Sequence, residues 1–343
     1  MNAPDRRVYV GCYTNGAPAS EAGIVSFALD GDGLLHRPTV TPASNPSFLA
    51  SAGGLLYAAH ETTPGRVRTY RRGAGGLTPY ASTTTGGDGP AHVAVAADRS
   101  HLVIPNYASG HVTALTIDGD GHPGTPSVWV GTGSGPHPGR QQGSHPHQAV
   151  QLPTGTWLIP DLGTDAIVEL AVRPGAAPSC VGRHPLPPGC GPRHLVVRDD
   201  WLFVAGELDS HIHGLHRLDG GYRWRWSVST FDIDQIIACP TNDPSHIQLG
   251  EDRTHLYVAN RGRDTITVFT VRSDAAGTRL ELEQERSTEG HWPRHFAVTG
   301  DRLYVANQLS DRVCVFALDP RTATIGELLQ SVDVRAPACV LVA

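Results

Sequence analysis

The stretch GCGPRHLVVRDDWLFVAGELDS, residues 189–210, has the pattern of a β-hairpin with charged residues at its open end. A proline leads into one apolar run, two aspartates mark a turn, and a second apolar run ends just before Glu207. Apolar runs rich in β-branched and aromatic residues, separated by turn residues, are typical of antiparallel strands. Arg193, His194 and Glu207 would then emerge together, either as solvated strand ends or as part of a site.

The same outline recurs along the chain. The other copies are NPSFLASAGGLLYAAHE, GPAHVAVAADRSHLVIPNY, HPHQAVQLPTGTWLIPDLG, DPSHIQLGEDRTHLYVANRG and WPRHFAVTGDRLYVANQLS. Successive copies begin about 44 to 56 residues apart, a spacing within the range of propeller blades. A third β-like run follows most of them, and no segment has a convincing long helical period. The pattern predicts an all-β fold built from repeated blades.

The two ends of the chain supply the parts of one further blade. The C-terminal APACVLVA is a first strand that begins with proline and has no hairpin partner, whereas the N-terminal RRVYVGCYT and GIVSFAL are a second and a third strand. Their pairing would close the ring with main-chain hydrogen bonds and cover two exposed edges. The sequence therefore predicts one domain over residues 1–343, a seven-bladed β-propeller closed by pairing of the C-terminal strand with the N-terminal blade.

Composition narrows the classes of function. The formal net charge is −6 with no basic block, which argues against nucleic acid as a partner. All 27 basic residues are arginine, so no lysine can form a Schiff base or act as a general base. The six cysteines show no CxxC and no metal-ligand spacing, and we expect them to be buried free thiols. Neither a signal-peptide core nor a membrane span is apparent, so we expect a cytoplasmic protein that does not contact a membrane.

The hairpin geometry predicts a cluster of polar side chains at one mouth of the central channel. In each hairpin the start of the first strand lies beside the end of the second, about fourteen residues later. These would be the two innermost strands of each blade, so all six pairs should emerge at the same mouth. The predicted pairs are Ser47 with Glu61, His92 with Asn106, His147 with Asp161, Arg193 with Glu207, His246 with Asn260, and Arg294 with Gln308.

The side chains at this mouth favour a site for an anionic ligand, because arginine binds carboxylate or phosphate through two parallel hydrogen bonds. The glycine-rich segment GTGSGPHPGRQQGSHPHQ, residues 131–148, is long enough to form part of the pocket wall. Asparagine and aspartate at the end of a strand also commonly cap turns, which is the structural alternative for them. The predicted substrate-binding residues are Asn106, Arg140, Asp161, His194, His246, Arg294, His295 and Gln308.

Several motifs resemble those of the seven-bladed lactonase family, which includes the propeller type of 6-phosphogluconolactonase and the fungal carboxy-muconate cyclases. They are YVGCYTNG, NPSFLA, GPAHVAV, RQQGSHPHQ, PDLGTDAIVEL, GPRHLVV, GELDS, VANRGRDTITVF and PRHFAV, in order along the whole chain. The resemblance implies a catalytic cluster of histidine, arginine and glutamate at one mouth. It places the catalytic residues at His145 or His147, Arg193, Glu207 and Arg261. It departs at His246, since related chains usually carry an acidic residue there.

The expected activity is hydrolysis of a small anionic lactone of the sugar-acid type, as in a 6-phosphogluconolactonase, without a cofactor or a metal. A histidine near neutral pKa, or a glutamate whose pKa is raised by burial, would take a proton from the attacking water. One arginine would stabilise the oxyanion, and another would hold a carboxylate or phosphate of the substrate. No GxSxG nucleophile motif is present, which favours direct attack by water.

Three alternatives remain open from the sequence. The same residues could close a ring, as in a carboxymuconate-type cyclase or isomerase. The propeller could instead bind a ligand or a protein without catalysis. As a weaker alternative, His145 and His147 with His246 or His295 could hold a divalent ion. In each case we expect a monomer or a simple homo-oligomer, and for the enzyme a small-molecule substrate.

Overall fold

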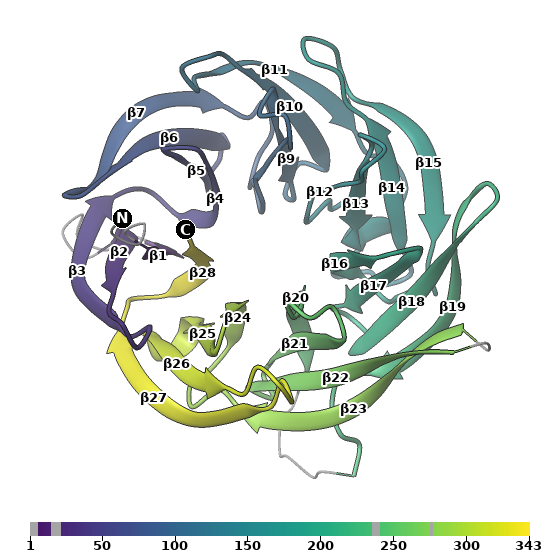
Figure 1. The fold of residues 1–343 in the computed structure, drawn as a ribbon. Helices are drawn as coiled ribbons and strands as arrows, with labels where there is room; N and C mark the ends of the chain where they lie inside the picture. The colour runs from purple at the N-terminus through teal and green to yellow at the C-terminus, as the bar shows by residue number, and fades with distance from the viewer. Residues whose placement is uncertain (1–5, 15–21, 235–240, 275–276) are drawn as a thin grey trace.

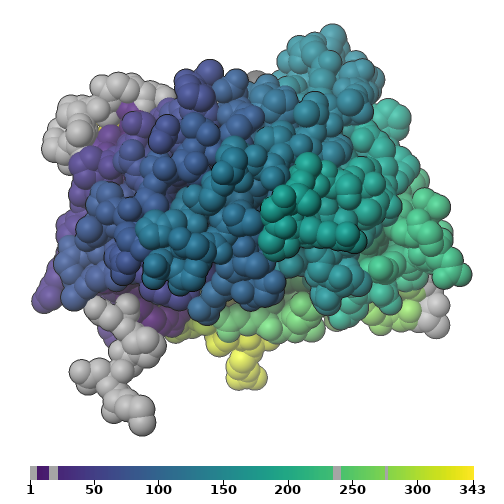
Figure 2. Space-filling model, turned by 90° about the horizontal axis from the view of Figure 1, so that it is seen from above, coloured from purple at the N-terminus to yellow at the C-terminus, as the bar shows by residue number. Residues whose placement is uncertain are grey.

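The chain folds into a ring of β-sheets. The computed structural model describes residues 6–14, 22–234, 241–274 and 277–343. Its strands form seven four-stranded sheets, which are arranged as blades around a central axis (Figure 1). Seen edge-on, the ring is a thick disc (Figure 2). The predicted all-β, seven-bladed propeller is therefore confirmed.

Each blade runs from an innermost strand near the axis to an outermost strand at the rim (Figure 1). The closing blade contains β28 (Pro337–Val342), β1 (Arg7–Cys12), β2 (Gly23–Leu29) and β3 (Leu35–Pro42). The second blade contains β4 (Pro46–Ala52), β5 (Leu55–His60), β6 (Arg66–Gly73) and β7 (Gly76–Thr84). The third contains β8 (Ala94–Val95), β9 (His101–Asn106), β10 (His111–Ile117) and β11 (Pro123–Val130). The fourth contains β12 (Val150–Gln151), β13 (Trp157–Asp161), β14 (Ala166–Ala171) and β15 (Ser179–Pro185).

The last three blades continue the same order around the ring. The fifth blade contains β16 (Pro192–Arg198), β17 (Trp201–Gly206), β18 (His211–Leu218) and β19 (Gly221–Ser229). The sixth contains β20 (Asp243–Leu249), β21 (His255–Arg261), β22 (Thr265–Asp274) and β23 (Gly277–Ser287). The seventh contains β24 (Pro293–Thr299), β25 (Arg302–Asn307), β26 (Arg312–Leu318) and β27 (Ile325–Asp333). Two 3₁₀ turns in the described part of the chain, η1 (Leu162–Thr164) and η2 (Gln308–Ser310), follow the second strands of their blades.

The two ends of the chain close the ring as predicted. Strand β28 pairs antiparallel with β1, in a register that runs from Val8 opposite Val342 to Gly11 opposite Cys339. Figure 1 shows β28 beside β1 in this blade, although the two strands come from opposite ends of the sequence. Closure pairs the inner edge of β1, which would otherwise be open to pair with another chain.

The hydrophobic core lies between neighbouring blades. The second strand of a blade is buried along almost its whole length, as in β9 (HLVIPN) and β17 (WLFVAG). Because adjacent blades cover both faces of such a strand, its sequence is a continuous apolar run rather than an alternating one. One core cluster joins two neighbouring blades and includes Phe203, Ile212, Ile247, Val258 and Phe269.

The register of the inner hairpins differs from the predicted pairing by one or two residues. In the blade that begins with β16, Pro192 pairs with Gly206 and His194 with Ala205, so Arg193 is left out of the ladder as a β-bulge. A bulge places one extra residue in one strand, which a count along the sequence does not detect. The observed pairs are Pro46 with His60, Pro90 with Asn106, Pro146 with Asp161, Pro192 with Gly206, Pro244 with Asn260, and Pro293 with Asn307.

Cysteine burial agrees with expectation at most described positions. The thiols of Cys12, Cys190, Cys314 and Cys339 are buried and free, whereas Cys180 is free and exposed; Cys239 lies outside the described residues. Among the described residues, no helix is long and apolar enough to cross a membrane. The cytoplasmic location stays a prediction.

Candidate active site

One mouth of the ring holds a charged cluster centred on the carboxylate of Glu207. This residue directly follows β17, and its side chain is only 4% exposed. Its Oε2 lies 3.0 Å from Nε of Arg193 and 2.7 Å from Nη2 of Arg261. Its Oε1 forms an ion pair with Nη2 of Arg140, which belongs to the connection between β11 and β12. Three guanidinium groups from separate parts of the chain therefore converge on one carboxylate.

The blade architecture brings these side chains to the same place. Arg193 is the bulge residue of β16, and Arg261 is the last residue of β21 in the next blade. Bulges redirect a side chain out of the ladder, and they are common beside functional sites for this reason. Arg193 Nη1 donates to the carbonyl oxygen of Ser245, and Arg261 Nε donates to that of Asp243 at 3.0 Å. Both guanidinium groups are thus oriented by backbone carbonyls of β20, which belongs to the blade of Arg261 and to the blade next to that of Arg193.

The surrounding charges keep Glu207 ionised. Burial acts to raise the pKa of its carboxyl group, but Arg261 and Arg193 outweigh burial, so the pKa lies well below its usual value. Burial together with Arg261 lowers the pKa of Arg193 to about 9, which still leaves this guanidinium charged at neutral pH. Burial is the larger cause of this lowering, and repulsion from the guanidinium groups of Arg261 and Arg294 adds to it. A bound anion would relieve that repulsion.

A second polar group lies beside the Glu207 cluster at the same mouth. Tyr13 Oη donates to Oε2 of Glu61 at 2.6 Å. The guanidinium of Arg294 lies 4.9 Å from the centre of the Tyr13 ring, and its Nη1 donates to Oε1 of Gln308 at 3.3 Å. Burial acts to lower the pKa of Arg294, but Tyr13 and Glu61 outweigh it and raise that pKa. Arg294 therefore adds a fourth charged guanidinium group beside the Glu207 cluster.

The segment 131–148 forms part of the mouth, as predicted for a pocket wall, and it places two histidines differently. Nδ1 of His145 lies 2.8 Å from the carbonyl oxygen of Tyr107, and the His145 ring stacks on the Tyr107 ring at 4.6 Å. His147 is buried, and burial together with Arg193 lowers its pKa well below the ordinary value. The imidazole of His147 is therefore neutral at pH 7 and able to accept a proton.

A layer of histidines fills the axis of the ring just inside this mouth. We call Phe48, His92, His194, His246 and His295 the histidine collar; each stands two positions after the proline that begins the inner part of its blade. Nδ1 of His194 lies 2.9 Å from Nδ1 of His246, and the His246 ring stacks on the His295 ring at 3.9 Å. Burial lowers the pKa of all four imidazoles, so the collar is neutral at physiological pH.

The collar predicts a loss of stability in mild acid. Burial lowers the pKa of His92 and of His295 to about 3, from 6.5 in an unfolded chain, so the unfolded state binds more protons below pH 6.5. The contribution of these neutral imidazoles to the stability of the folded state is complete above pH 6.5 and is lost as the pH falls from 6.5 towards 3. Each such ring should lower the free energy of unfolding by up to about 1.4 kcal/mol per pH unit in this window.

Urea unfolding at several pH values between about 7 and 4 measures this slope. The variant His92→Gln removes one titrating ring from the collar and should show a shallower slope than wild type. A free energy of unfolding that stays constant over this range would show that the collar is not held neutral by burial.

A family model described as "Lactonase, 7-bladed beta-propeller" matches residues 7–342. The chain belongs to the seven-bladed β-propeller lactonase family. Among its lactonase relatives, the 6-phosphogluconolactonase of Bacillus subtilis is 30% identical over 350 residues, which cover 97% of each chain. A structure described as the periplasmic gluconolactonase of Pseudomonas aeruginosa has a TM-score of 0.86 at 30% identity, over 98% of each chain. A protein from Lactobacillus plantarum has a TM-score of 0.89 at 30% identity and covers 98% of this chain and 99% of its own.

In this lactonase-family protein, the mouth that holds the Glu207 cluster brings together many of the residues predicted from the sequence. The Glu207 cluster contains Arg140, Arg193 and Arg261, and His147 stands beside it. The predicted substrate-binding residues Arg294 and Gln308 form the neighbouring group, whereas His194, His246 and His295 lie deeper, in the collar. The described residues include no group of three or more His, Cys, Asp or Glu that could hold a metal ion, so nothing there supports the divalent-ion alternative.

Asn106 and Asp161 lie instead in the links between blades. Asn106 is fully buried; its Oδ1 accepts from Thr85 Oγ1 at 2.6 Å, and its Nδ2 donates to Thr113 Oγ1 at 3.0 Å. The carboxylate of Asp161 accepts from Ser144 Oγ and from a backbone N–H, both at 2.7 Å. These contacts use the polar atoms of both side chains. We therefore leave both residues out of the substrate pocket in the proposal below.

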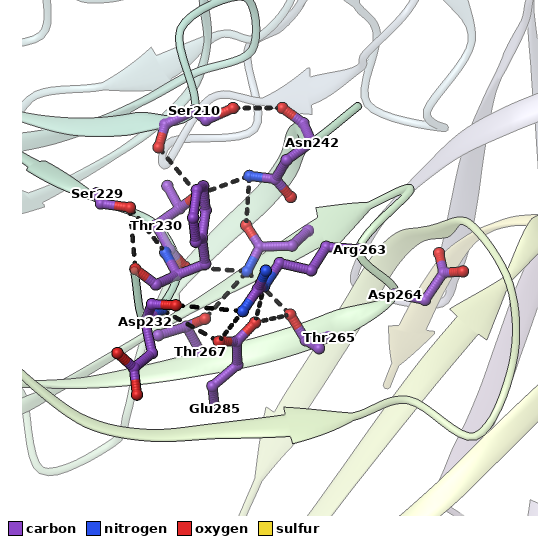
Figure 3. Close-up of polar contacts among 12 residues, drawn as sticks. Ser210, Ser229, Thr230, Asp232, Asn242, Arg263, Asp264, Thr265, Thr267 and Glu285 are labelled. Carbon is purple, nitrogen blue, oxygen red and sulfur yellow. Dashed lines mark hydrogen bonds and ion pairs between the residues drawn. The ribbon is translucent and has the colours of Figure 1, made fainter. Parts of the chain in front are cut away.

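A related buried network fixes the next part of the mouth (Figure 3). Nε of Arg263 lies 2.5 Å from Oε1 of Glu285, and both side chains are almost fully buried. Arg263 Nη2 donates to the carbonyl oxygen of Asp232 at 3.2 Å, and Glu285 Oε2 accepts from the backbone N–H of Asp232 at 3.1 Å. Asn260 Nδ2 donates to the carbonyl oxygen of Thr230 at 3.0 Å. The network attaches the start of the connection after β19 to the end of β21, where the Arg261 side chain enters the cluster.

Two aromatic residues of the mouth were missed in the sequence. Tyr13 directly follows β1 and Tyr107 directly follows β9, which is the position that Glu61 and Glu207 occupy in their own blades. The repeat therefore contained the signal. A tyrosine after an apolar run also has the composition of a strand residue, so the sequence does not distinguish the two positions from the end of the strand.

Proposed function

We propose that this lactonase-family protein hydrolyses a small anionic lactone of the sugar-acid type, with 6-phosphogluconolactone as the first candidate substrate. The observation that carries the proposal is the convergence of Arg140, Arg193 and Arg261 on one buried carboxylate, beside the neutral imidazole of His147. The relatives named 6-phosphogluconolactonase and gluconolactonase support the lactone class. Crowded guanidinium groups suit a substrate that carries a carboxylate or a phosphate.

The charge states of His147, Glu207 and the arginines support a different role for each group. His147 is the general base, because its imidazole is neutral and buried beside the cluster. Glu207, which the sequence left open as a base, is a poor one because guanidinium groups already occupy both of its carboxylate oxygens. Its role is to orient the guanidinium groups of Arg193 and Arg261, which stabilise the oxyanion. Arg140, whose side chain is 38% exposed, stands outermost and suits a phosphate.

The proposed reaction uses water alone. The oxygen of a water molecule bonds to the lactone carbonyl carbon while His147 takes one proton of that water. The carbonyl oxygen becomes an oxyanion opposite the arginines. When the tetrahedral intermediate collapses, the bond from carbon to ring oxygen breaks, and protonated His147 returns its proton to that oxygen. The new carboxylic acid then ionises at neutral pH, so each turnover releases one proton.

The first experiment is a direct assay of wild-type protein on 6-phosphogluconolactone and on δ-gluconolactone. Acid release above the spontaneous rate, with the open-chain acid identified by NMR, would support the proposal. Inertness to both lactones would contradict it. Ring closure of a carboxymuconate-type acid would then favour the cyclase alternative, and inertness to that acid as well would favour a binding propeller.

Arg140→Gln tests whether the outermost guanidinium recognises a phosphate. We expect KM for 6-phosphogluconolactone to rise by roughly tenfold or more, since a hydrogen bond to a charged group contributes about 1.5–3 kcal/mol. KM for δ-gluconolactone should change far less, because that substrate carries no phosphate. An equal effect on both lactones would show that Arg140 acts through Glu207 instead.

A further inference from the structure

A small cavity lies directly inside the arginine cluster. Its volume is about 10 Å³, close to the space that one water molecule needs. Its lining includes Ser47, His147 and His194, whose side chains are all more than nine-tenths buried. Ser47 Oγ, His147 Nδ1 and His194 Nε2 have no hydrogen-bond partner among the described residues. Buried polar atoms in native proteins are nearly always satisfied, so these three atoms indicate a polar ligand of this size.

A continuous set of imidazoles leads from this cavity to the other side of the ring. The ring centres of His147 and His194 are 5.3 Å apart, and His194 Nδ1 lies 2.9 Å from His246 Nδ1. His246 and His295 line a groove of about 460 Å³ along the inner strands β24 and β28. This groove extends to the ends of those strands at the mouth opposite the arginine cluster. The imidazoles thus join the cavity to a groove whose lining reaches the opposite mouth.

We propose that the cavity binds one water molecule that bridges Ser47, His147 and His194, and that this water starts a proton relay through His194 and His246 to the opposite mouth. The inference rests on the proposed function, because hydrolysis of a lactone produces one proton per turnover. Bound product would cover the arginine mouth at the moment when that proton has to leave. An exit on the other side removes this conflict.

The proton balance of the relay is simple. After the lactone ring oxygen has been protonated, the new carboxylic acid ionises by giving its proton to Nε2 of His147. Protonated His147 gives its Nδ1 proton to the bridging water, and the water gives a proton to Nε2 of His194. His194 passes its Nδ1 proton to Nδ1 of His246, and His246 releases its Nε2 proton into the groove. Each ring gains a proton at one nitrogen and loses one from the other, so one passage leaves the three rings as their other tautomers. Rotation of the rings or proton exchange with water restores the starting tautomers before the next turnover, and no redox partner is needed.

The charges around the path agree with brief protonation of each ring. Arg193, Arg294 and Glu207 surround His147, and the net effect of burial and Arg193 is to lower its pKa. His92 and Arg193 face both His194 and His246, and His295 also faces His246, again with a lowered pKa for each ring. None of the three rings on the path would therefore retain the proton at neutral pH.

A high-resolution crystal structure of the wild-type protein tests the water site independently of activity. We expect an ordered water about 2.7–3.2 Å from Ser47 Oγ, His147 Nδ1 and His194 Nε2. Its occupancy should fall in a structure of Ser47→Ala. A wild-type cavity without an ordered water, or with the two imidazoles in direct contact, would overturn the water site.

Steady-state kinetics of His246→Gln test the relay. With little buffer present, kcat should fall, by less than the roughly 10²-fold that removal of a general base costs. Added imidazole should restore kcat, because it accepts the proton from His147 at the substrate mouth once the product has left. The matched control is His92→Gln, since His92 belongs to the collar but is not among the described residues that line the cavity or the groove. Its kcat should stay at the wild-type value and should not respond to imidazole.

The outcomes separate the relay from the proposed function. If wild-type protein hydrolyses a lactone but His246→Gln keeps wild-type kcat at low buffer, the relay is wrong and the function stands. A loss of kcat that imidazole does not restore, or the same loss in His92→Gln, also overturns the relay and indicates a packing role. A wild-type protein inert to lactones overturns both the function and the relay, whereas the crystallographic water is judged on its own.

Discussion

Replacement of His147 by glutamine is expected to lower kcat for lactone hydrolysis by roughly 10²–10⁴-fold, the usual contribution of a general base. Its imidazole is neutral because burial and Arg193 lower its pKa, and it lies beside the Glu207 cluster. Glutamine has a similar size and polarity but cannot accept a proton. The measurement is acid release from 6-phosphogluconolactone, corrected for spontaneous hydrolysis.

The comparison variant is His145→Gln, because the sequence alone could not choose between the two histidines. His145 is bound through Nδ1 to the carbonyl oxygen of Tyr107 and stacks on its ring, so we expect it to support the pocket wall. Its replacement should cost much less activity than that of His147. The opposite order of effects would assign the base to His145 and overturn the proposed mechanism.

Glu207→Gln is expected to reduce both activity and stability. The change leaves Arg140, Arg193 and Arg261 without their common anion in a largely buried site. Loss of one partner from a buried ion pair commonly costs about 3–5 kcal/mol of the free energy of unfolding. Misplaced oxyanion donors should lower kcat by roughly 10²–10³-fold. Urea unfolding and lactone kinetics on the same preparation measure the two effects.

Loss of both activity and stability in Glu207→Gln distinguishes a carboxylate that orients the arginines from one that acts as a catalytic base. Glu207→Asp keeps the negative charge and should retain more stability than Glu207→Gln. Inorganic phosphate should partly restore the stability of the glutamine variant, because it supplies an anion to the same guanidinium groups. If Glu207→Gln lost activity at wild-type stability, Glu207 would be acting as a base and the proposed roles would have to be exchanged.

Most of the fold could be predicted because the repeat is visible in short stretches. A proline, two apolar runs and a turn between them mark the inner hairpin of a blade. APACVLVA supplies the strand that is missing from the blade of RRVYVGCYT. The error lay in the register: Arg193 was paired with Glu207, whereas the ladder pairs Pro192 with Gly206. A bulge depends on how the two strands meet, so the sequence of either strand alone does not show it.

The candidate site was partly predictable for the same reason. The equal hairpins indicated that Arg193, Glu207 and Arg261 would share a mouth, and the structure brings them into direct contact. The sequence could not exclude Asn106 from the substrate pocket, because the same amide can bind a ligand or link two blades. Its hydrogen bonds to Thr85 and Thr113 became visible only in the assembled ring.

By itself the sequence determined the ring of seven blades and the mouth at which each hairpin end emerges, because strand period, turn residues and repeat spacing are local properties of the chain. Only the tertiary structure decided the charge states. Glu207 is an anion, and not a carboxylic acid with a raised pKa, because guanidinium groups from three distant segments lie around it. His147 and the collar are neutral because the closed ring buries them. A pKa depends on distances and burial in three dimensions, which no local pattern encodes.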